Sequence, residues 1–148
     1  MKSIRVVLLI AALVVIPLTV STLRAQQGTT PSPTPTPTIN VFSRTMVDQG
    51  QQVGEVMVGN NVVFRLRESA GGYNPGERAA IVASRLSTLL SQGHTWQDLR
   101  VGRQQNQAAL FMGDSLLVTA DAAHAQYNHE TPMQLAYDWQ ARTQSALR

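Results

Sequence analysis

The sequence predicts an α+β domain in which antiparallel strands carry helices on one face. β-branched segments occur in groups separated by tight-turn residues, and each group is followed by a helix with its own start signal. The expected order is two strands and a helix, then two or three strands and a second helix. This domain is expected to occupy residues 53–148. Residues 39–52 are weakly patterned and predict a weakly structured lead-in, an edge strand and then a loop.

The first strand pair and its helix have the clearest signals. Residues 53–58 and 62–67 are rich in β-branched residues and flank Gly59-Asn60-Asn61, which predicts a hairpin. A helix is expected to begin at Asn74-Pro75-Gly76-Glu77. Asn is a good cap, Pro suits the first helical position, and Glu at N3 can reach back to the cap amide. An apolar stripe follows, and Gly93 is expected to end the helix.

The second half of the domain follows the same plan. Strand-like segments occur at residues 99–101, 108–112 and 116–120, and Gly113-Asp114 between the last two suits a type II′ hairpin turn. Residues 121–127 predict a short turn or helix. Thr131-Pro132-Met133-Gln134 repeats the capping pattern of the first helix, so a last helix is expected to run from there to the C-terminus.

The N-terminal segment indicates where the domain works. Lys2 and Arg5 precede an apolar run (residues 6–23), and Ala25 is a small residue at a suitable cleavage position. Residues 1–25 are therefore expected to be a signal peptide or an uncleaved membrane anchor. Residues 26–38 contain Pro alternating with Thr or Ser, which predicts an extended, disordered linker. Either alternative implies an extracytoplasmic location: secreted, periplasmic or at the cell surface.

Charge and cysteine content exclude several classes of function. Three of the twelve basic residues lie in the first 38 residues and none of the nine acidic residues does, so residues 39–148 are formally neutral. A nucleic-acid-binding protein would carry its basic surplus in the folded domain, and we expect no nucleic-acid partner. With no cysteine there is no disulfide framework and no thiol catalysis. No cofactor is expected.

One four-residue string resembles a catalytic motif. Gly113-Asp114-Ser115-Leu116 spells the signature of GDSL esterases, and Asp121 and His124 have the spacing that supplies the other two catalytic groups in that family. That family places its serine where a strand turns into a helix, whereas Ser115 leads into another strand-like run. We therefore interpret Ser115, Asp121 and His124 as a chance match, and keep a small serine hydrolase as the alternative function.

Two further sets of residues are candidates for binding sites. His124 and His129 are five residues apart, a spacing that turns them away from each other on a helix, so no metal site is expected. Arginines on predicted strands could form an anion or partner-binding surface together with a tyrosine in a Gly-rich loop. These residues are Arg65, Arg67, Arg100, Arg103 and Tyr73.

Six short segments carry a resemblance to a known family. They are Val63-Phe64-Arg65, Pro75-Gly76-Glu77-Arg78-Ala79 with Ser84-Arg85-Leu86, Gly113-Asp114-x-x-Leu117-Val118-Thr119, Asp121-Ala122 and Thr131-Pro132-x-x-Leu135-Ala136. From Val62 onward the chain resembles the extracytoplasmic domain that precedes the channel module in some bacterial, notably cyanobacterial, mechanosensitive-channel-like proteins. The resemblance implies a small α+β module for sensing or assembly, with Asp114 and Asp121 as turn and cap residues and no catalytic residues. The sequence up to Arg148 contains no channel segments. The resemblance therefore implies the sensing or assembly module and does not imply ion conduction.

Location, neutrality and resemblance together predict the function class. We expect a non-catalytic extracytoplasmic domain that binds a partner protein or a component of the cell envelope. An envelope or membrane protein is the expected partner, and the N-terminal segment would contact the membrane if it is not cleaved.

Overall fold

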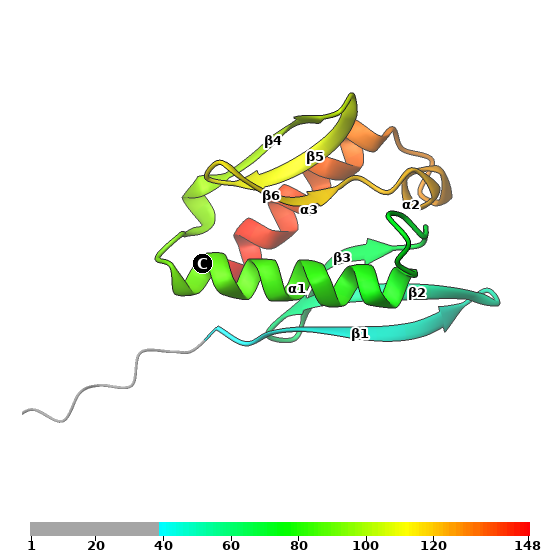
Figure 1. The fold of residues 1–148 in the computed structure, drawn as a ribbon, viewed down its shortest axis with the longest axis horizontal. Coiled ribbons are helices and arrows are strands. Elements are labelled where there is room, and N and C mark those ends of the chain that lie inside the picture. The colour runs from blue at the N-terminus through cyan, green and yellow to red at the C-terminus, as the bar shows by residue number, and fades with distance from the viewer. Residues whose placement is uncertain (1–38) are drawn as a thin grey trace, which may run out of the picture. The chain divides into compact units, whose positions relative to one another are not determined.

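The computed structural model describes residues 39–148, which form two three-stranded antiparallel sheets and three α-helices (Figure 1). The predicted signal or anchor and the predicted linker lie outside the described residues. The first sheet has the order β1-β2-β3 and the second the order β4-β5-β6. The elements are β1 (Val41–Asp48), β2 (Gln51–Val58), β3 (Asn61–Leu66), α1 (Pro75–Ser91), a 3-10 turn (Trp96–Asp98), β4 (Leu99–Gln104), β5 (Gln107–Met112), β6 (Ser115–Thr119), α2 (Ala122–Tyr127) and α3 (Pro132–Leu147).

Two-residue turns connect the strands within each sheet. Gln49 and Gly50 both have positive φ, of 50° and 76°, and so do Gln105 and Asn106, at 46° and 70°. Positive φ at both central residues is what a type I′ turn requires. In the other two hairpins only the first central residue, Gly59 or Gly113, has positive φ, which agrees with the type II′ turn predicted at Gly113-Asp114.

The two long helices begin where the sequence predicted. The Asn74 side chain accepts a hydrogen bond from the Glu77 N–H at 2.9 Å, and the Glu77 carboxylate accepts one from the Asn74 N–H at 2.8 Å. Thr131 and Gln134 form the same reciprocal box at the start of α3. Each box satisfies backbone donors that the first turn of a helix leaves unpaired.

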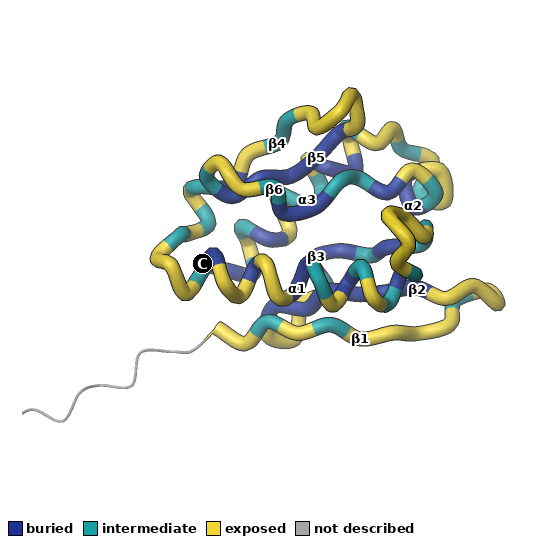
Figure 2. The backbone as a smooth tube through the Cα atoms, in the orientation of Figure 1, coloured by how far each residue is buried: buried dark blue, intermediate teal, exposed yellow. Residues whose placement is uncertain are grey.

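The hydrophobic core lies where α1 and α3 pack against the sheets. α1 packs on β1 and β2, while α3 contacts β3, β4 and β5. Phe64 and Trp139 are both fully buried and meet edge to face, with ring centroids 5.4 Å apart. Figure 2 shows that β2, β3 and β5 are mostly buried whereas β1 is mostly exposed. The predicted α+β class is confirmed, with the strands divided between two sheets.

The ordered domain begins earlier than the sequence predicted. β1 pairs with β2 along its whole length, from Val41 opposite Val58 to Asp48 opposite Gln51, so residues 41–48 are a regular strand and not a weakly structured lead-in. The predicted start at Val53 was wrong, although the edge strand itself was expected. Backbone pairing with β2 and the packing of α1 hold β1 in place, and because most of its side chains are exposed they show no clear apolar pattern.

None of the helices formed by residues 39–148 is long and apolar enough to span a lipid bilayer.

Candidate functional site

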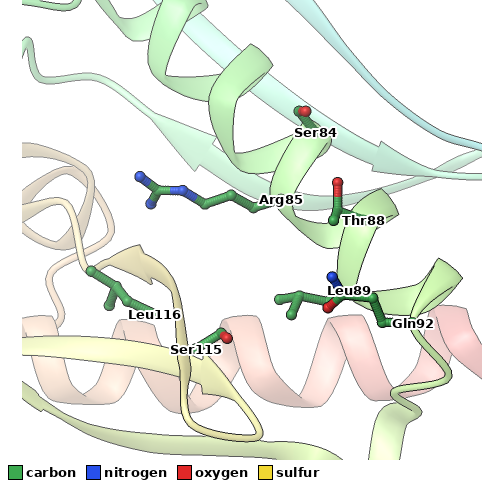
Figure 3. A pocket seen from close by; sticks show the side chains of 7 residues that line it. All are labelled: Ser84, Arg85, Thr88, Leu89, Gln92, Ser115 and Leu116. Atoms are coloured by element: carbon green, nitrogen blue, oxygen red, sulfur yellow. The ribbon is translucent and has the colours of Figure 1, made fainter.

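A groove runs between helix α1 and strand β6. Two adjoining pockets, with volumes of about 360 and about 270 Å³, lie there and share Arg85 of α1 and Leu116 of β6. We call them together the α1–β6 groove. The first pocket is lined mainly by polar residues, and the second is lined by Tyr73, Ile81 and Val118 among others. Figure 3 shows Arg85 and Leu89 extending from α1 on the side of Ser115 and Leu116.

The spacing of residues on α1 explains how one helix serves both the core and the groove. The side chains of Val82, Leu86 and Leu89 form the buried stripe. Ile81, Arg85, Thr88 and Gln92 follow one another at intervals of three or four residues, so they share the neighbouring face of the helix. That face lines the groove.

The other wall of the groove is the edge of a sheet. β6 is the last strand of the second sheet, and within the described residues no strand pairs with its outer side. The register shifts between Leu110 and Phe111 of β5, so Leu117 has no direct partner there. Its carbonyl oxygen instead accepts a long hydrogen bond, 3.5 Å, from Nη1 of Arg85. The groove therefore offers main-chain groups on one wall and a guanidinium on the other.

Arg85 is exposed and has no carboxylate partner among the described residues. Six of the other arginines form ion pairs: Arg44, Arg65, Arg67, Arg78, Arg100 and Arg142. The guanidinium of Arg148 lies over the ring of Trp96, 4.4 Å from its centroid. A cation that no carboxylate neutralises, placed between two adjoining pockets, is suited to bind an anionic group.

The arginine surface predicted from the sequence does not exist as a single site. Arg65 and Arg67 belong to the end of the first sheet, whereas Arg100 and Arg103 lie on β4 in the second. Arg65 pairs with the buried Glu55 at 2.7 Å, and Arg100 pairs with Asp114 at 3.3 Å. Strand-like segments alone could not show which sheet each would join. Tyr73 does lie in the α1–β6 groove and is 49% exposed.

Arg67 was predicted to belong to an anion or partner-binding surface, but it is the centre of a closed polar network. Its side chain is only 2% exposed and pairs with the carboxylate of Asp48. Its Nε donates to Nδ1 of His124 at 3.1 Å, and its guanidinium lies 3.7 Å from the centroid of the Tyr127 ring. The hydrogen bond from Arg67 holds the pKa of Asp48 below its usual value of 3.8.

Asp121 completes this network from the start of α2. The residue is 1% exposed, and its carboxylate accepts hydrogen bonds from the backbone N–H groups of Arg67 and Glu68, at 2.9 and 2.8 Å. It also pairs with Nη1 of Arg78 at 2.9 Å and caps α2 by accepting from the N–H of His124 at 2.9 Å. The four donors come from the end of β3, from α1 and from α2. The buried carboxylate of Asp121 therefore holds these three elements together, and its role is structural. The cap position implied by the resemblance is confirmed.

His124 is held neutral inside the domain. Its ring lies between those of Tyr127 and Trp139, with centroids 6.2 and 6.4 Å away. Burial, together with the positive charge of Arg67, lowers the pKa of His124 from 6.5 to about 4. Nδ1 must accept the hydrogen bond from Arg67, which requires the unprotonated form of that nitrogen.

The structure does not assemble Ser115, Asp121 and His124 into a triad. Ser115 lines the polar pocket of the groove at the start of β6, and the extended chain from there to Asp121 spans roughly 20 Å. The carboxylate of Asp121 contacts the backbone of His124 and not its ring. Ring nitrogen Nδ1 is occupied by Arg67, and Nε2 lies 3.4 Å from the side-chain amide of Asn128. The geometry of a serine nucleophile with its base is therefore missing.

No group of three or more His, Cys, Asp or Glu residues within positions 39–148 is arranged to hold a metal ion.

Sequence reasoning missed Arg85 as a site residue, although a signal was present. On a helix its neighbours at three and four positions are Ile81, Val82, Thr88 and Leu89, none of which is acidic. An arginine in such surroundings cannot form the usual ion pair along its own helix. That pattern could have marked it as available for another partner.

Comparison with known proteins identifies a family but no described function. Residues 55–148 match the family model described as "Domain of unknown function (DUF8459)". No curated protein and no solved structure matches the chain significantly. The match begins within β2, includes all later elements to the end of α3 and covers well over half of the chain. The chain therefore belongs to the DUF8459 family.

Proposed function

We propose that this protein is a non-catalytic, extracytoplasmic binding module whose α1–β6 groove takes an extended, acidic segment of a partner protein. The observation that carries the proposal is Arg85, an exposed cation without a carboxylate partner that lies between the two adjoining pockets. An Asp or Glu side chain of the partner would supply the missing anion through a charge-assisted hydrogen bond.

The outer edge of β6 favours an extended ligand. A peptide that adds to a sheet edge gains main-chain hydrogen bonds, while pockets for alternate side chains give specificity. β6 has five residues, so about five residues of a partner could lie along it. The apolar end of the groove, with Tyr73, Ile81 and Val118, would take an uncharged side chain next to the acidic one.

The cellular setting is proposed from the leader and from the resemblance. Residues 1–25 have the parts of a secretory signal or anchor, and residues 26–38 have the composition of a spacer. These features support a domain held at or beyond the membrane, with an envelope or membrane protein as its partner. The resemblance to extracytoplasmic domains of mechanosensitive-channel-like proteins supports a role as an accessory in sensing or assembly.

A displayed library of random hexapeptides tests the groove. We expect the purified protein to select peptides that carry Asp or Glu at one fixed position, and Arg85→Gln to lose that selection. Arg103→Gln is the matched control, because Arg103 lies on β4 in the second sheet and does not line the groove. Selection of the same acidic peptides by Arg85→Gln, or no selection at all, would contradict the proposal.

The hydrolase alternative has its own measurement. Ester hydrolysis by the purified protein is compared with hydrolysis by Ser115→Ala, and we expect neither to exceed the background rate. Turnover that disappears in Ser115→Ala would show that Ser115 is a nucleophile and would overturn the non-catalytic assignment.

A further inference from the structure

β1 is the open edge of the first sheet, whereas β6 of the α1–β6 groove is an edge of the second sheet. β1 is an edge strand of eight residues that pairs with β2 without a bulge. Within residues 39–148 no strand lies on its other side. Natural proteins usually protect such an edge with outward charges, proline or a bulge, because unpaired main-chain groups recruit another strand.

Both charged residues of β1 are paired within the chain, although the side chain of Arg44 remains 53% exposed. Arg44 turns back onto its own sheet, where its Nε lies 2.5 Å from the carboxylate of the buried Glu55. Asp48 turns back in the same way and pairs with Arg67. The large apolar side chains of Phe42, Met46 and Val47 are meanwhile 39%, 37% and 71% exposed. The edge therefore presents backbone groups and apolar side chains with its charges already neutralised.

The pairing with β2 determines which residues of β1 direct their main-chain groups outward. Asn40 O accepts from Gly59 N at 2.8 Å, so the even-numbered residues direct their groups toward β2. The alternation of an antiparallel strand then directs the N–H and C=O groups of Val41, Ser43, Thr45 and Val47 to the open side. These four residues form a symmetric set about Arg44.

We infer that β1 pairs antiparallel with β1 of a second copy of this chain, about a two-fold axis at Arg44. In this register Val41 lies opposite Val47 of the second copy and Ser43 lies opposite Thr45, so all four outward residues are hydrogen-bonded. Phe42 lies opposite Met46 of the second copy, and the two exposed apolar side chains cover each other. The two Arg44 side chains meet at the axis, where each is already neutralised by its own Glu55.

The placement of α1 is compatible with this register. α1 packs on β1 and β2 to a similar extent, from which we infer that its axis runs over the gap between these two strands. Joining two β1 strands would then put the two α1 axes about 10 Å apart, which is a normal distance for packed helices. Gly76 of α1 adjoins Thr45 of β1, and the residues on the same side of the helix are the small, exposed Ala80 and Ser87. No long side chain on that side keeps the two helices apart.

A second copy fits this edge better than a different protein does. A two-fold interface requires that each surface be complementary to itself about one axis. Three features of this edge meet that requirement: the outward main-chain groups of β1, the contact between Phe42 and Met46, and the face of α1 with small side chains. The result would be a continuous six-stranded sheet, with the α1–β6 groove of each copy left open.

Analytical ultracentrifugation of the purified protein tests the pairing, with Val47→Pro as the disrupting variant. Proline removes an outward N–H of an edge strand and leaves the pairing with β2 intact. We expect a dimer for the natural protein and a monomer with an unchanged circular dichroism spectrum for Val47→Pro. A natural protein that is monomeric at every concentration, or a dimer that survives Val47→Pro, would overturn the inference.

Disulfide cross-linking tests the register. The protein has no cysteine, so any disulfide between copies must come from introduced residues. In this register position 42 of one copy and position 46 of the other form a non-hydrogen-bonded pair. Their Cα atoms should be about 4.5 Å apart, which is within disulfide range. We expect the double variant Phe42→Cys/Met46→Cys to form cross-linked dimers on oxidation and neither single variant to do so. Efficient cross-linking of the single variants would contradict this register.

Discussion

Two arginine-centred regions of the domain differ in how their charge is neutralised. In the closed polar network, Arg67 and Arg78 face Asp48 and Asp121, and every charged group has a partner within the chain. In the α1–β6 groove, Arg85 has only the carbonyl of Leu117 at 3.5 Å. Arg78 and Arg85 lie on the same helix, α1. They differ because Arg78 faces the carboxylate of Asp121, whereas Arg85 faces only the carbonyl of Leu117.

This difference separates groups that hold the fold together from groups that are available to a ligand. A buried charge is tolerated only when it is paired and hydrogen-bonded, so the network has to be complete before anything binds. An exposed guanidinium remains hydrated and needs no internal partner. The domain can therefore leave Arg85 unpaired at little cost in stability, and a partner's carboxylate can take that position.

The largest effect is expected when the closed network loses its central carboxylate. Asp121→Asn removes the charge that Arg78 and two backbone N–H groups face, and it should lower the free energy of unfolding by about 3–5 kcal/mol. Urea denaturation measures this. Asp114→Asn is the matched control, because Asp114 is fully exposed in a hairpin turn, and it should change stability by less than about 0.5 kcal/mol. Similar losses of unfolding free energy in both variants would show that the buried network contributes no more to stability than an exposed ion pair does.

Acidification should weaken the same network through His124. The unfolded chain binds a proton at His124 near pH 6.5, whereas the folded domain does so only near pH 4. Because the unfolded state binds more protons in this window, stability should fall by about 3 kcal/mol as the pH drops from 6.5 to 4. Asp48 and Asp98, whose pKa values are lowered from 3.8, act mainly below this window.

Denaturation curves between pH 4 and pH 7 measure the effect of His124. His124→Gln should flatten this part of the pH profile, and His129→Gln, at an exposed position after α2, should leave it as in the natural protein. A profile that is unchanged in His124→Gln would mean that another group controls the acid response.

The same substitution, arginine to glutamine, at two positions of α1 compares the closed network with the groove directly. Arg78→Gln leaves Asp121 without its ion-pair partner and should cost about 2–3 kcal/mol. Arg85→Gln has no such consequence and should stay within about 0.5 kcal/mol of the natural protein. Thermal and urea unfolding of the two variants provide the test. A loss at Arg85 as large as that at Arg78 would mean that Arg85 supports the fold.

Local signals in the sequence were sufficient to predict both long helices and the four strands that flank the hairpin turns at Gly59 and Gly113. Capping at Asn74 and Thr131 depends on residues three positions away, and turns at Gly59 and Gly113 depend on one residue's backbone freedom. The start of the domain at β1 was not predictable, because an edge strand with little burial is held by backbone pairing that leaves no apolar pattern.

The site was harder to predict than the fold because it depends on tertiary contacts. Asp121 was expected to be a cap, but its bonds to Arg67, Glu68 and Arg78 join residues more than 40 positions apart. Likewise, Arg67 and Arg103 were grouped as possible anion ligands, although one is buried and the two belong to different sheets. Strand-like spacing gives the alternation of side chains but not the sheet or the face that they join.

A charge swap across the groove tests the central claim most directly. An acidic peptide selected by the natural protein is compared with its lysine-substituted analogue, each titrated against the natural protein and against Arg85→Glu. If Arg85 binds the partner's carboxylate, the natural protein should prefer the acidic peptide and Arg85→Glu should prefer the lysine analogue, each by at least about tenfold. Equal binding of the acidic peptide by both proteins would contradict the claim that Arg85 in the α1–β6 groove recognises an anionic segment.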